Sequence, residues 1–411
     1  MTRLPEHGTA WAELQQQMQE AARNDVDWRH GRAPMFIHYA GDDVLEVAKQ
    51  AYLMFFSENG LGQRAFGSLA RFEADVVAMG LGLLNGGAAG RGAMTTGGTE
   101  SIFLAVKSAR DFSRQHRSVK GTPAIVLPFS AHPAFDKAAH FLGLTTIRVP
   151  LRADFTADPQ AMALAVTPDT IMMVGSAPAY PHGVMDPIGE IAAAAQARGL
   201  WMHVDACVGG YFAPFARKLG YPVAAFDFSL PGVTSISADL HKYGYTAKGA
   251  STLFFRDEAG FAHMEYRFDN WPRGQYMTRT LVGTRGGGAI AAAWAVMNYL
   301  GEEGYLRVTE RIIATRRAIE AGLAPLGLHA LGRPELSILA YGSPEIDIAA
   351  LGRGLGSRGW LVGHVSNPDG VHMMLNLTHE PVVDQYVADV AAALQEAGAA
   401  GSARVGVDAA Y

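Results

Sequence analysis

A lysine that follows a short apolar run is the first residue in this chain that could do chemistry. The stretch SISADLHKYGYTAKGAS, residues 235–251, places Lys242 beside His241 and directly after a predicted strand. A lysine in a crowded, partly desolvated site loses its proton readily and can then act as a nucleophile. The stretch therefore indicates one of two things at Lys242, an ordinary surface charge or a covalent anchor.

Three other polar clusters stand at comparable places. The stretch TTGGTES, residues 95–101, opens a helical run, and its glycines and helix N–H groups can face an anion such as phosphate. His132 stands at a predicted helix start, where a structural hydrogen bond is the alternative role. Asp205 ends an apolar run, where a carboxylate is costly unless it meets a cation or several donors. A helix cap is the alternative for Asp205.

Alternating apolar runs and Ala-rich helical stretches supply the elements that must position these residues. Six runs have the composition of strands and are separated by stretches with helical spacing: 123–129, 145–150, 170–176, 200–206, 233–238 and 251–256. This alternation predicts an α/β fold with a mostly parallel central sheet covered by helices on both faces. Ligands collect at the carboxyl ends of the strands in such a sheet, which is where the polar clusters lie.

The pattern changes from about residue 304. A long charged helix leads into strand-like runs at 336–341, 360–365 and 371–377, and a helix follows near 380–398. We therefore predict an N-terminal segment (1–65), a large domain (66–303) and a smaller C-terminal α/β domain (304–411). We expect the last stretch, 397–411, to be frayed.

Composition excludes several classes of function. The 411 residues carry 34 basic and 39 acidic side chains without a block of like charges, which argues against a nucleic-acid partner. Cys207 is the only cysteine, which excludes an internal disulfide and suits a protein in a reducing compartment. The start lacks a secretory signal, and the apolar run 286–300 is too short for a membrane span. We expect a soluble, cytoplasmic protein that binds a small molecule, with no membrane partner and no metal site.

Taken together, the four clusters are the parts needed to hold pyridoxal 5'-phosphate. A lysine can form a Schiff base with its aldehyde, and a carboxylate can stabilise its protonated pyridine nitrogen. Their order and spacing also resemble those of fold-type I pyridoxal phosphate enzymes, within them the sphingosine phosphate lyase branch of the group II decarboxylase superfamily. The resemblance runs from about residue 35 to 310 and is carried by TTGGTESIFLAVKSARD, APAYPHGVMDPIGEIA, HVDACVGGYFAPF, GVTSISADLHKYGYTAKGAS and GEEGYLRVTERI.

The resemblance implies a role for each matching residue. Lys242 would carry the Schiff base, Asp205 would pair with the pyridine nitrogen, and His132 would stack on the ring. The phosphate would be held by four residues: Gly98, Thr99, Ser237 and His241. The family also implies a homodimer with active sites at the interface, where the segment LVGTRGGG would bring Thr284 to the partner's cofactor.

Three readings of the reaction follow from this cofactor. The leading one is a carbon–carbon lyase, acting by decarboxylation or retro-aldol cleavage on a small amino acid or amino alcohol. Retro-aldol cleavage needs a base for the β-hydroxyl, and Lys248 matches a second active-site lysine of the family, with Tyr245 and Tyr276 as weaker candidates. The alternatives are an aminotransferase-like enzyme on the same scaffold and a non-catalytic binding protein.

Two departures from the family pattern bear on the substrate. Gly62 stands where sphingosine phosphate lyases have a histidine, and Arg279 stands where they tend to have proline, with Arg273 nearby. An arginine binds a carboxylate in bidentate fashion, although both arginines could simply face solvent. These departures favour a small, carboxylate-bearing amino substrate, with sphingosine phosphate as the alternative.

Overall fold

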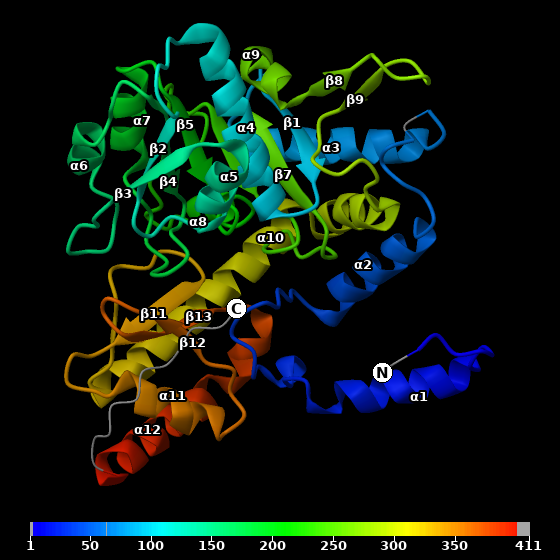
Figure 1. Ribbon diagram of the computed structural model, residues 1–411. Helices are drawn as coiled ribbons and strands as arrows, with labels where there is room; N and C mark the ends of the chain where they lie inside the picture. The colour runs from blue at the N-terminus through cyan, green and yellow to red at the C-terminus, as the bar shows by residue number, and fades with distance from the viewer. Residues whose placement is uncertain (1–2, 63, 401–411) are drawn as a thin grey trace.

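A seven-stranded sheet forms the centre of the larger part of the chain (Figure 1). The computed structural model describes residues 3–62 and 64–400. The strand order is β1-β7-β6-β5-β4-β2-β3, with β2 to β6 paired in parallel and β7 antiparallel to both β1 and β6. The strands are β1 (Arg91–Thr95), β2 (Ala124–Pro128), β3 (Thr145–Val149), β4 (Thr170–Ser176), β5 (Trp201–Asp205), β6 (Ser235–Ala238) and β7 (Ser251–Phe255).

The predicted mostly parallel sheet is confirmed, and each of its six predicted strands is present. β1 was not predicted, because Met94 is the only large apolar side chain in the run RGAMT, which also contains an arginine and a glycine. Successive strand residues enter two different apolar cores, as Ile125 and Leu127 do on one face and Val126 on the other. Both faces are therefore buried, which explains why the strands are apolar throughout instead of alternating.

Helices cover both faces of this sheet. The shorter ones lie between the strands in the chain, and α4, which starts at the end of β1, packs against α5 and the strands β6 and β7. Their bounds are α3 (Gly67–Leu83), α4 (Gly98–His116), α5 (Ala134–Leu142), α6 (Pro159–Leu164), α7 (Ile188–Gln196), α8 (Ala213–Lys218) and α9 (Glu258–Phe261), followed by the 3₁₀ turn η3 (Ala262–Met264). The start of α4 therefore faces the same sheet edge as the ends of the parallel strands.

The C-terminal part is a four-stranded antiparallel sheet of order β10-β11-β13-β12 with helices packed on it. Its elements are η4 (Ala324–Leu326), β10 (His329–Ala330), β11 (Ile338–Gly342), α11 (Ile348–Gly356), β12 (Gly363–Val365), β13 (Gly370–Met374), η5 (Leu377–Val382) and α12 (Val383–Ala400). The predicted strands and final helix of this part are present. Of the stretch predicted to fray, residues 401–411 lie outside the described residues.

One long helix joins the two parts. α10 (Gly287–Leu323) spans 37 residues and is interrupted at Gly301, whose φ of 54° is not helical. It includes both the apolar run 286–300 and the charged helix predicted from residue 304. The predicted domain boundary at 303/304 falls inside α10, close to Gly301, and the division into domains remains a prediction.

The N-terminal segment and a hairpin extend from this body. α1 (Trp11–Ala21) contains no buried residue and lies apart from the rest of the chain, followed by η1 (Ala22–Asn24), η2 (Trp28–His30) and α2 (Asp42–Met54), which packs on α10. The hairpin of β8 (Tyr266–Phe268) and β9 (Tyr276–Thr278) projects beside the sheet (Figure 1). None of the helices between residues 3 and 62 or 64 and 400 combines the length and the apolar composition of a membrane-spanning segment.

Candidate active site

A cavity of about 480 Å³ lies where the carboxyl ends of β4, β5 and β6 meet the start of α4. We call it the cofactor cavity. Its wall includes seven of the residues predicted to act at the site: Gly98, Thr99, His132, Asp205, His241, Lys242 and Lys248. Phe36 and Met374 close it from the N-terminal segment and the C-terminal sheet, so all three parts of the chain meet here.

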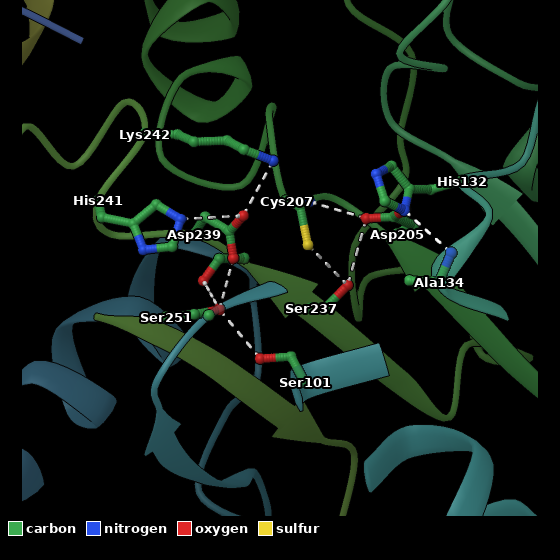
Figure 2. Close-up of polar contacts among 12 residues, drawn as sticks. Ser101, His132, Ala134, Asp205, Cys207, Ser237, Asp239, His241, Lys242 and Ser251 are labelled. Carbon is green, nitrogen blue, oxygen red and sulfur yellow. Dashed lines mark hydrogen bonds and ion pairs between the residues drawn. The ribbon is translucent and has the colours of Figure 1, made fainter. Parts of the chain in front are cut away.

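Lys242 faces a carboxylate that the sequence did not reveal. Its Nζ lies 2.9 Å from Oδ2 of Asp239, which is only 2% exposed (Figure 2). Burial by itself lowers the pKa of Lys242, but the Asp239 carboxylate outweighs burial and raises that pKa above its ordinary value. Lys242 is therefore a partly buried ammonium paired with a buried carboxylate, which argues against an ordinary surface charge.

A chain of hydroxyl groups holds Asp239 in place. The Oγ of Ser251 donates to Oδ1 of Asp239 at 2.6 Å, and Ser101 lies 2.9 Å from Ser251 (Figure 2). Thr95 continues the chain at 2.6 Å from Ser101. Burial raises the pKa of Asp239, but the charge of Lys242, helped by the Ser251 hydrogen bond, holds that pKa below its ordinary value. Asp239 is thus a fixed, ionised group.

Asp205 ends β5 and is 8% exposed. Its Oδ1 accepts hydrogen bonds from the Cys207 backbone N–H at 3.1 Å and from the Ser237 hydroxyl at 3.4 Å (Figure 2). The next helix, α8, begins only at Ala213, so Asp205 does not cap it. Ser237 is fully buried behind Asp205 and orients it, and its predicted contact with a phosphate remains a prediction.

His132 lies on the same side of the cavity, just before α5. Its Nδ1 accepts the backbone N–H of Ala134 at 3.1 Å, so the neutral ring carries its proton on Nε2. Burial lowers the pKa of His132, an effect that the nearby Asp205 charge partly opposes. A neutral, half-buried ring beside Asp205 and Lys242 suits the predicted position against an aromatic cofactor.

The start of α4 forms the predicted anion cradle. A side chain at Gly98 would place its Cβ 2.7 Å from Asp239 Oδ2 and 2.9 Å from Cys207 Sγ, so only glycine fits there. The first-turn N–H groups of α4 have no acceptors within the helix and can bind a phosphate. With Lys242, Asp205 and His132 at the same cavity, the residues present fit pyridoxal 5'-phosphate.

A second cavity of about 560 Å³ adjoins the first and shares His38 and Lys248 with it. We call it the apolar cavity, because carbon atoms form most of its wall. That wall consists of Trp28, Ile37, His38, Tyr39, Leu45, Ala48, Lys49, Tyr52, Leu53, Tyr245, Thr246, Ala247 and Lys248. The predicted substrate residue Tyr245 therefore belongs to this cavity and does not line the cofactor cavity.

Lys248 stands at the junction of the two cavities. Its Nζ donates to the backbone carbonyl of His241 at 3.2 Å. Lys248 is exposed as a residue, but the protein around its amine partly desolvates it and lowers its pKa, and the positive charge of Lys242 lowers that pKa further. Unlike Lys242, this lysine has no carboxylate partner among the described residues, so its neutral form is the more accessible one.

His38 at the same junction was not predicted. The segment before His38 lies along the C-terminal sheet. Leu361 N–H donates to Arg32 O at 2.8 Å and Met374 N–H donates to Pro34 O at 2.7 Å, and these hydrogen bonds position His38 at the site. Both of its ring nitrogens are enclosed without a hydrogen-bond partner among the described residues. Burial and the charges of Lys248 and Lys242 hold its pKa well below the ordinary value. A single histidine in the stretch FIHY, residues 36–39, gives no sequence signal that it lies beside the cofactor cavity.

Four other predicted residues lie outside both cavities. Arg279 pairs with Glu265 at 3.3 Å, Tyr276 belongs to the projecting hairpin, and neither Arg273 nor Thr284 reaches a cavity wall. The segment before Thr284 is anchored by Glu100, whose Oε1 accepts the Leu281 N–H at 2.7 Å. The predicted roles of these residues require a partner chain and remain predictions.

Gly62, the position of the expected family histidine, lies in a turn. Its N–H donates to Asn59 Oδ1 at 3.1 Å, and it lines neither cavity. Across residues 3–62 and 64–400, no group of three or more His, Cys, Asp or Glu side chains could hold a metal ion.

Comparisons with known proteins agree with this geometry. Residues 74–328 match the family model of the pyridoxal-dependent decarboxylase conserved domain. A sphingosine-1-phosphate lyase of Arabidopsis thaliana is 39% identical over 95% of this chain and 73% of the plant protein, and one of Mus musculus is 38% identical over 94% and 68%. The solved structure of a Burkholderia pseudomallei sphingosine-1-phosphate lyase has a TM-score of 0.93 at 36% identity and covers 97% of this chain and 94% of that one. A Lactobacillus brevis glutamate decarboxylase shares the fold, with a TM-score of 0.85 at 18% identity, and covers 98% and 96%.

Proposed function

Because this chain belongs to the pyridoxal-dependent decarboxylase family, on the branch of the sphingosine-1-phosphate lyases, we propose that it cleaves the Cα–Cβ bond of a phosphorylated β-hydroxy amine with an apolar tail. The broader assignment, a lyase that uses pyridoxal 5'-phosphate, follows from the family itself. The substrate and the bond are our proposal.

The observation that carries the proposal is the junction of the two cavities at Lys248 and His38. The cofactor cavity holds the residues that bind and activate an amine. The apolar cavity next to it offers aromatic and aliphatic side chains that a small amino acid would leave unused, but that an alkyl chain would cover. A substrate with an amine at one end and a long tail fits both cavities together.

A small carboxylate-bearing substrate, which the sequence favoured, has weaker support in this geometry. Arg279, the proposed carboxylate fork, pairs with Glu265 outside both cavities, so it could act only on a partner's substrate. Gly62 stands where the family pattern has a histidine, but Lys248 and His38 supply polar groups at the junction. We therefore place the phosphorylated β-hydroxy amine first.

The residues of this chain divide the reaction between them. When bound, the cofactor supplies an electron sink for the bond at Cα. Asp205 stabilises positive charge at the far end of the cavity, and the start of α4 holds the phosphate group. Lys248, whose neutral form is accessible, accepts the proton of the β-hydroxyl as the Cα–Cβ bond breaks and an aldehyde forms. His38 can hydrogen-bond the same hydroxyl and orient it.

We also propose that the protein acts as a homodimer. α1 exposes Trp11 (66%) and Met18 (63%), and Leu281 is 58% exposed in the segment that leads to Thr284. Large apolar side chains gathered on projecting elements mark interaction surfaces. A second copy would bury them, and Thr284 would then approach the partner's cofactor cavity. Size-exclusion chromatography with light scattering measures the mass, and a monomer at micromolar concentration would contradict the proposal.

The function is tested by separating the possible products. Purified enzyme is incubated with a phosphorylated sphingoid base, its unphosphorylated form, small β-hydroxy amino acids and simple α-amino acids. We expect fatty aldehyde from the phosphorylated base and little release of carbon dioxide or keto acid, with Lys242→Ala as the inactive control. Carbon dioxide from an α-amino acid without aldehyde would assign a decarboxylase instead, and keto acid would assign an aminotransferase.

A further inference from the structure

The ion pair between Lys242 and Asp239 has no part in the cleavage described above. The two groups lie 2.9 Å apart, and the carboxylate is additionally fixed by the Ser251 hydroxyl at 2.6 Å. Breaking a buried pair by removing one partner leaves an uncompensated charge, so the pair holds Lys242 in its charged form. The charged form of Lys242 is not nucleophilic, although attachment of the cofactor needs its neutral amine.

The other charges around Asp239 do not replace Lys242. His241 Nε2 lies 3.6 Å from Asp239 Oδ2, and burial lowers the pKa of His241, so this ring is neutral near pH 7. Cys207 is a buried thiol whose pKa burial raises, so it too is neutral. The remaining groups that face the pair are His132, Asp205 and Lys248, and none is within ion-pair distance of Asp239. Lys242 is therefore the one full positive charge that pairs with Asp239 among the described residues.

Covalent attachment of the cofactor needs the uncharged amine. The ammonium of Lys242 must first give its proton to solvent or to His241. The nitrogen then bonds to the aldehyde carbon, its two remaining N–H protons pass to the aldehyde oxygen, and that oxygen leaves as water as the C=N bond forms. An ion pair that stabilises the ammonium lowers the fraction of nucleophilic amine at any pH below the pKa of the lysine.

We propose that Asp239 controls cofactor loading: it keeps Lys242 as an ammonium in the cofactor-free enzyme and so slows covalent attachment at neutral pH. Asp239 is thus a positioning residue that acts through Lys242. Its place against Gly98 supports the same role, because its carboxylate lies beside the cradle that receives the cofactor phosphate. There the negative charges of the Asp239 carboxylate and the cofactor phosphate repel each other, which weakens cofactor binding until the site rearranges. The proposal is independent of the substrate that is cleaved.

The test measures attachment, not catalysis. Cofactor is stripped with cysteine, and the rate of covalent attachment is followed by absorbance between pH 6 and 9, a range we choose to lie below the pKa of the lysine. In Asp239→Asn, which keeps an acceptor for Ser251, we expect attachment at pH 7 to be at least about tenfold faster, corresponding to one pKa unit on Lys242. The pH at which the rate levels off should fall by a similar amount. Borohydride reduction and peptide mapping confirm that the label is on Lys242.

Asp227→Asn is the matched control. Asp227 is also fully buried and pairs with Arg217 at 3.0 Å, but it lines neither cavity. This variant loses a buried ion pair without touching Lys242. We expect its attachment rate to stay within about twofold of the wild type, even if its melting temperature falls.

Ser251→Ala distinguishes a role of Asp239 in cofactor loading from a purely structural role. Removing the Ser251 hydroxyl takes a hydrogen bond from the Asp239 carboxylate and makes it more basic, which strengthens its hold on the ammonium. We therefore expect slower attachment in Ser251→Ala and faster attachment in Asp239→Asn. A purely structural role would slow both variants. Unchanged or slower attachment in folded Asp239→Asn would overturn the proposal, whereas a label on another lysine would overturn the assignment of Lys242.

Discussion

The two adjoining cavities differ in how their polar groups are satisfied. In the cofactor cavity, Lys242 pairs with Asp239, and Asp205 accepts two hydrogen bonds. In the apolar cavity, the hydroxyl groups of Tyr245 and Thr246 are buried without a partner among the described residues. The ring nitrogens of His38, at the junction, also have none, whereas the residues that line the cofactor cavity alone include one such atom, His241 Nδ1. A buried polar group without a partner costs about 1–3 kcal/mol, so such groups are expected where a ligand completes them. The comparison separates a cavity organised for a resident cofactor from one organised for a substrate.

The largest effect is expected at Asp205, in the cofactor cavity. Asp205→Asn replaces the carboxylate with an amide that cannot stabilise a positive charge. We expect kcat to fall by at least about 100-fold, which corresponds to roughly 3 kcal/mol of transition-state stabilisation. Steady-state kinetics with saturating cofactor measures it. Normal turnover combined with a lower melting temperature would show that Asp205 is only structural.

The next largest effect is expected at the junction of the cavities. Lys248 must be neutral to act as a base, so the wild-type rate should rise as pH increases through its pKa, which burial has lowered. Lys248→Gln should lose up to about 100-fold in kcat and lose this rise with pH. The pH profile of kcat distinguishes the two cases. If the rise persists in Lys248→Gln, another group, with His38 the first candidate, accepts the proton.

A smaller effect, specific for the tail, is expected from Leu45→Glu in the apolar cavity. The charged side chain should lower kcat/KM for a long-chain substrate by about tenfold or more, because alkyl burial there would be lost. A substrate with a truncated tail should respond by no more than about twofold. Gln50→Glu is the matched control, since it adds the same charge to an exposed position of α2 that does not line the cavity. Equal losses of kcat/KM for the long and the truncated substrate would contradict the assignment of the apolar cavity to the substrate tail.

The smallest effect is expected from Arg279→Ala. Arg279 pairs with Glu265 on a half-exposed surface, so kcat/KM for the phosphorylated base should change by no more than about twofold. Both the base and a small amino acid are assayed. A large, selective loss with the small amino acid would restore the carboxylate-bearing substrate that the sequence favoured and would place Arg279 in a partner's active site.

The sequence predicted the fold and most of the cofactor cavity for a physical reason. Strands buried on both faces read as continuous apolar runs, and the residues at their ends, Asp205 and Lys242, stand out as polar exceptions. Asp239 precedes Lys242 by only three residues, but its pairing depends on a loop turning back on itself. Ser101 and Ser251 meet across 150 positions of sequence, which no local pattern indicates.

The apolar cavity was not predicted, because its wall comes from separate segments of ordinary composition. Leu45 and Ala48 belong to α2, while Thr246 and Lys248 belong to the loop after β6. His38 reaches the junction through backbone hydrogen bonds between the N-terminal segment and the C-terminal sheet. Only tertiary structure brings these segments together. The sequence therefore predicted the cofactor chemistry but did not predict the cavity that would hold the substrate.

The most direct test of the central claim is to locate the covalent bond to the cofactor. The purified enzyme is reduced with borohydride in the presence of pyridoxal 5'-phosphate, digested and mapped by mass spectrometry. We expect a single pyridoxyl group on Lys242 and none in Lys242→Ala, while Lys248 stays unmodified. A pyridoxyl group on Lys248, or retention of the label in Lys242→Ala, would contradict the role of Lys242 as the covalent anchor.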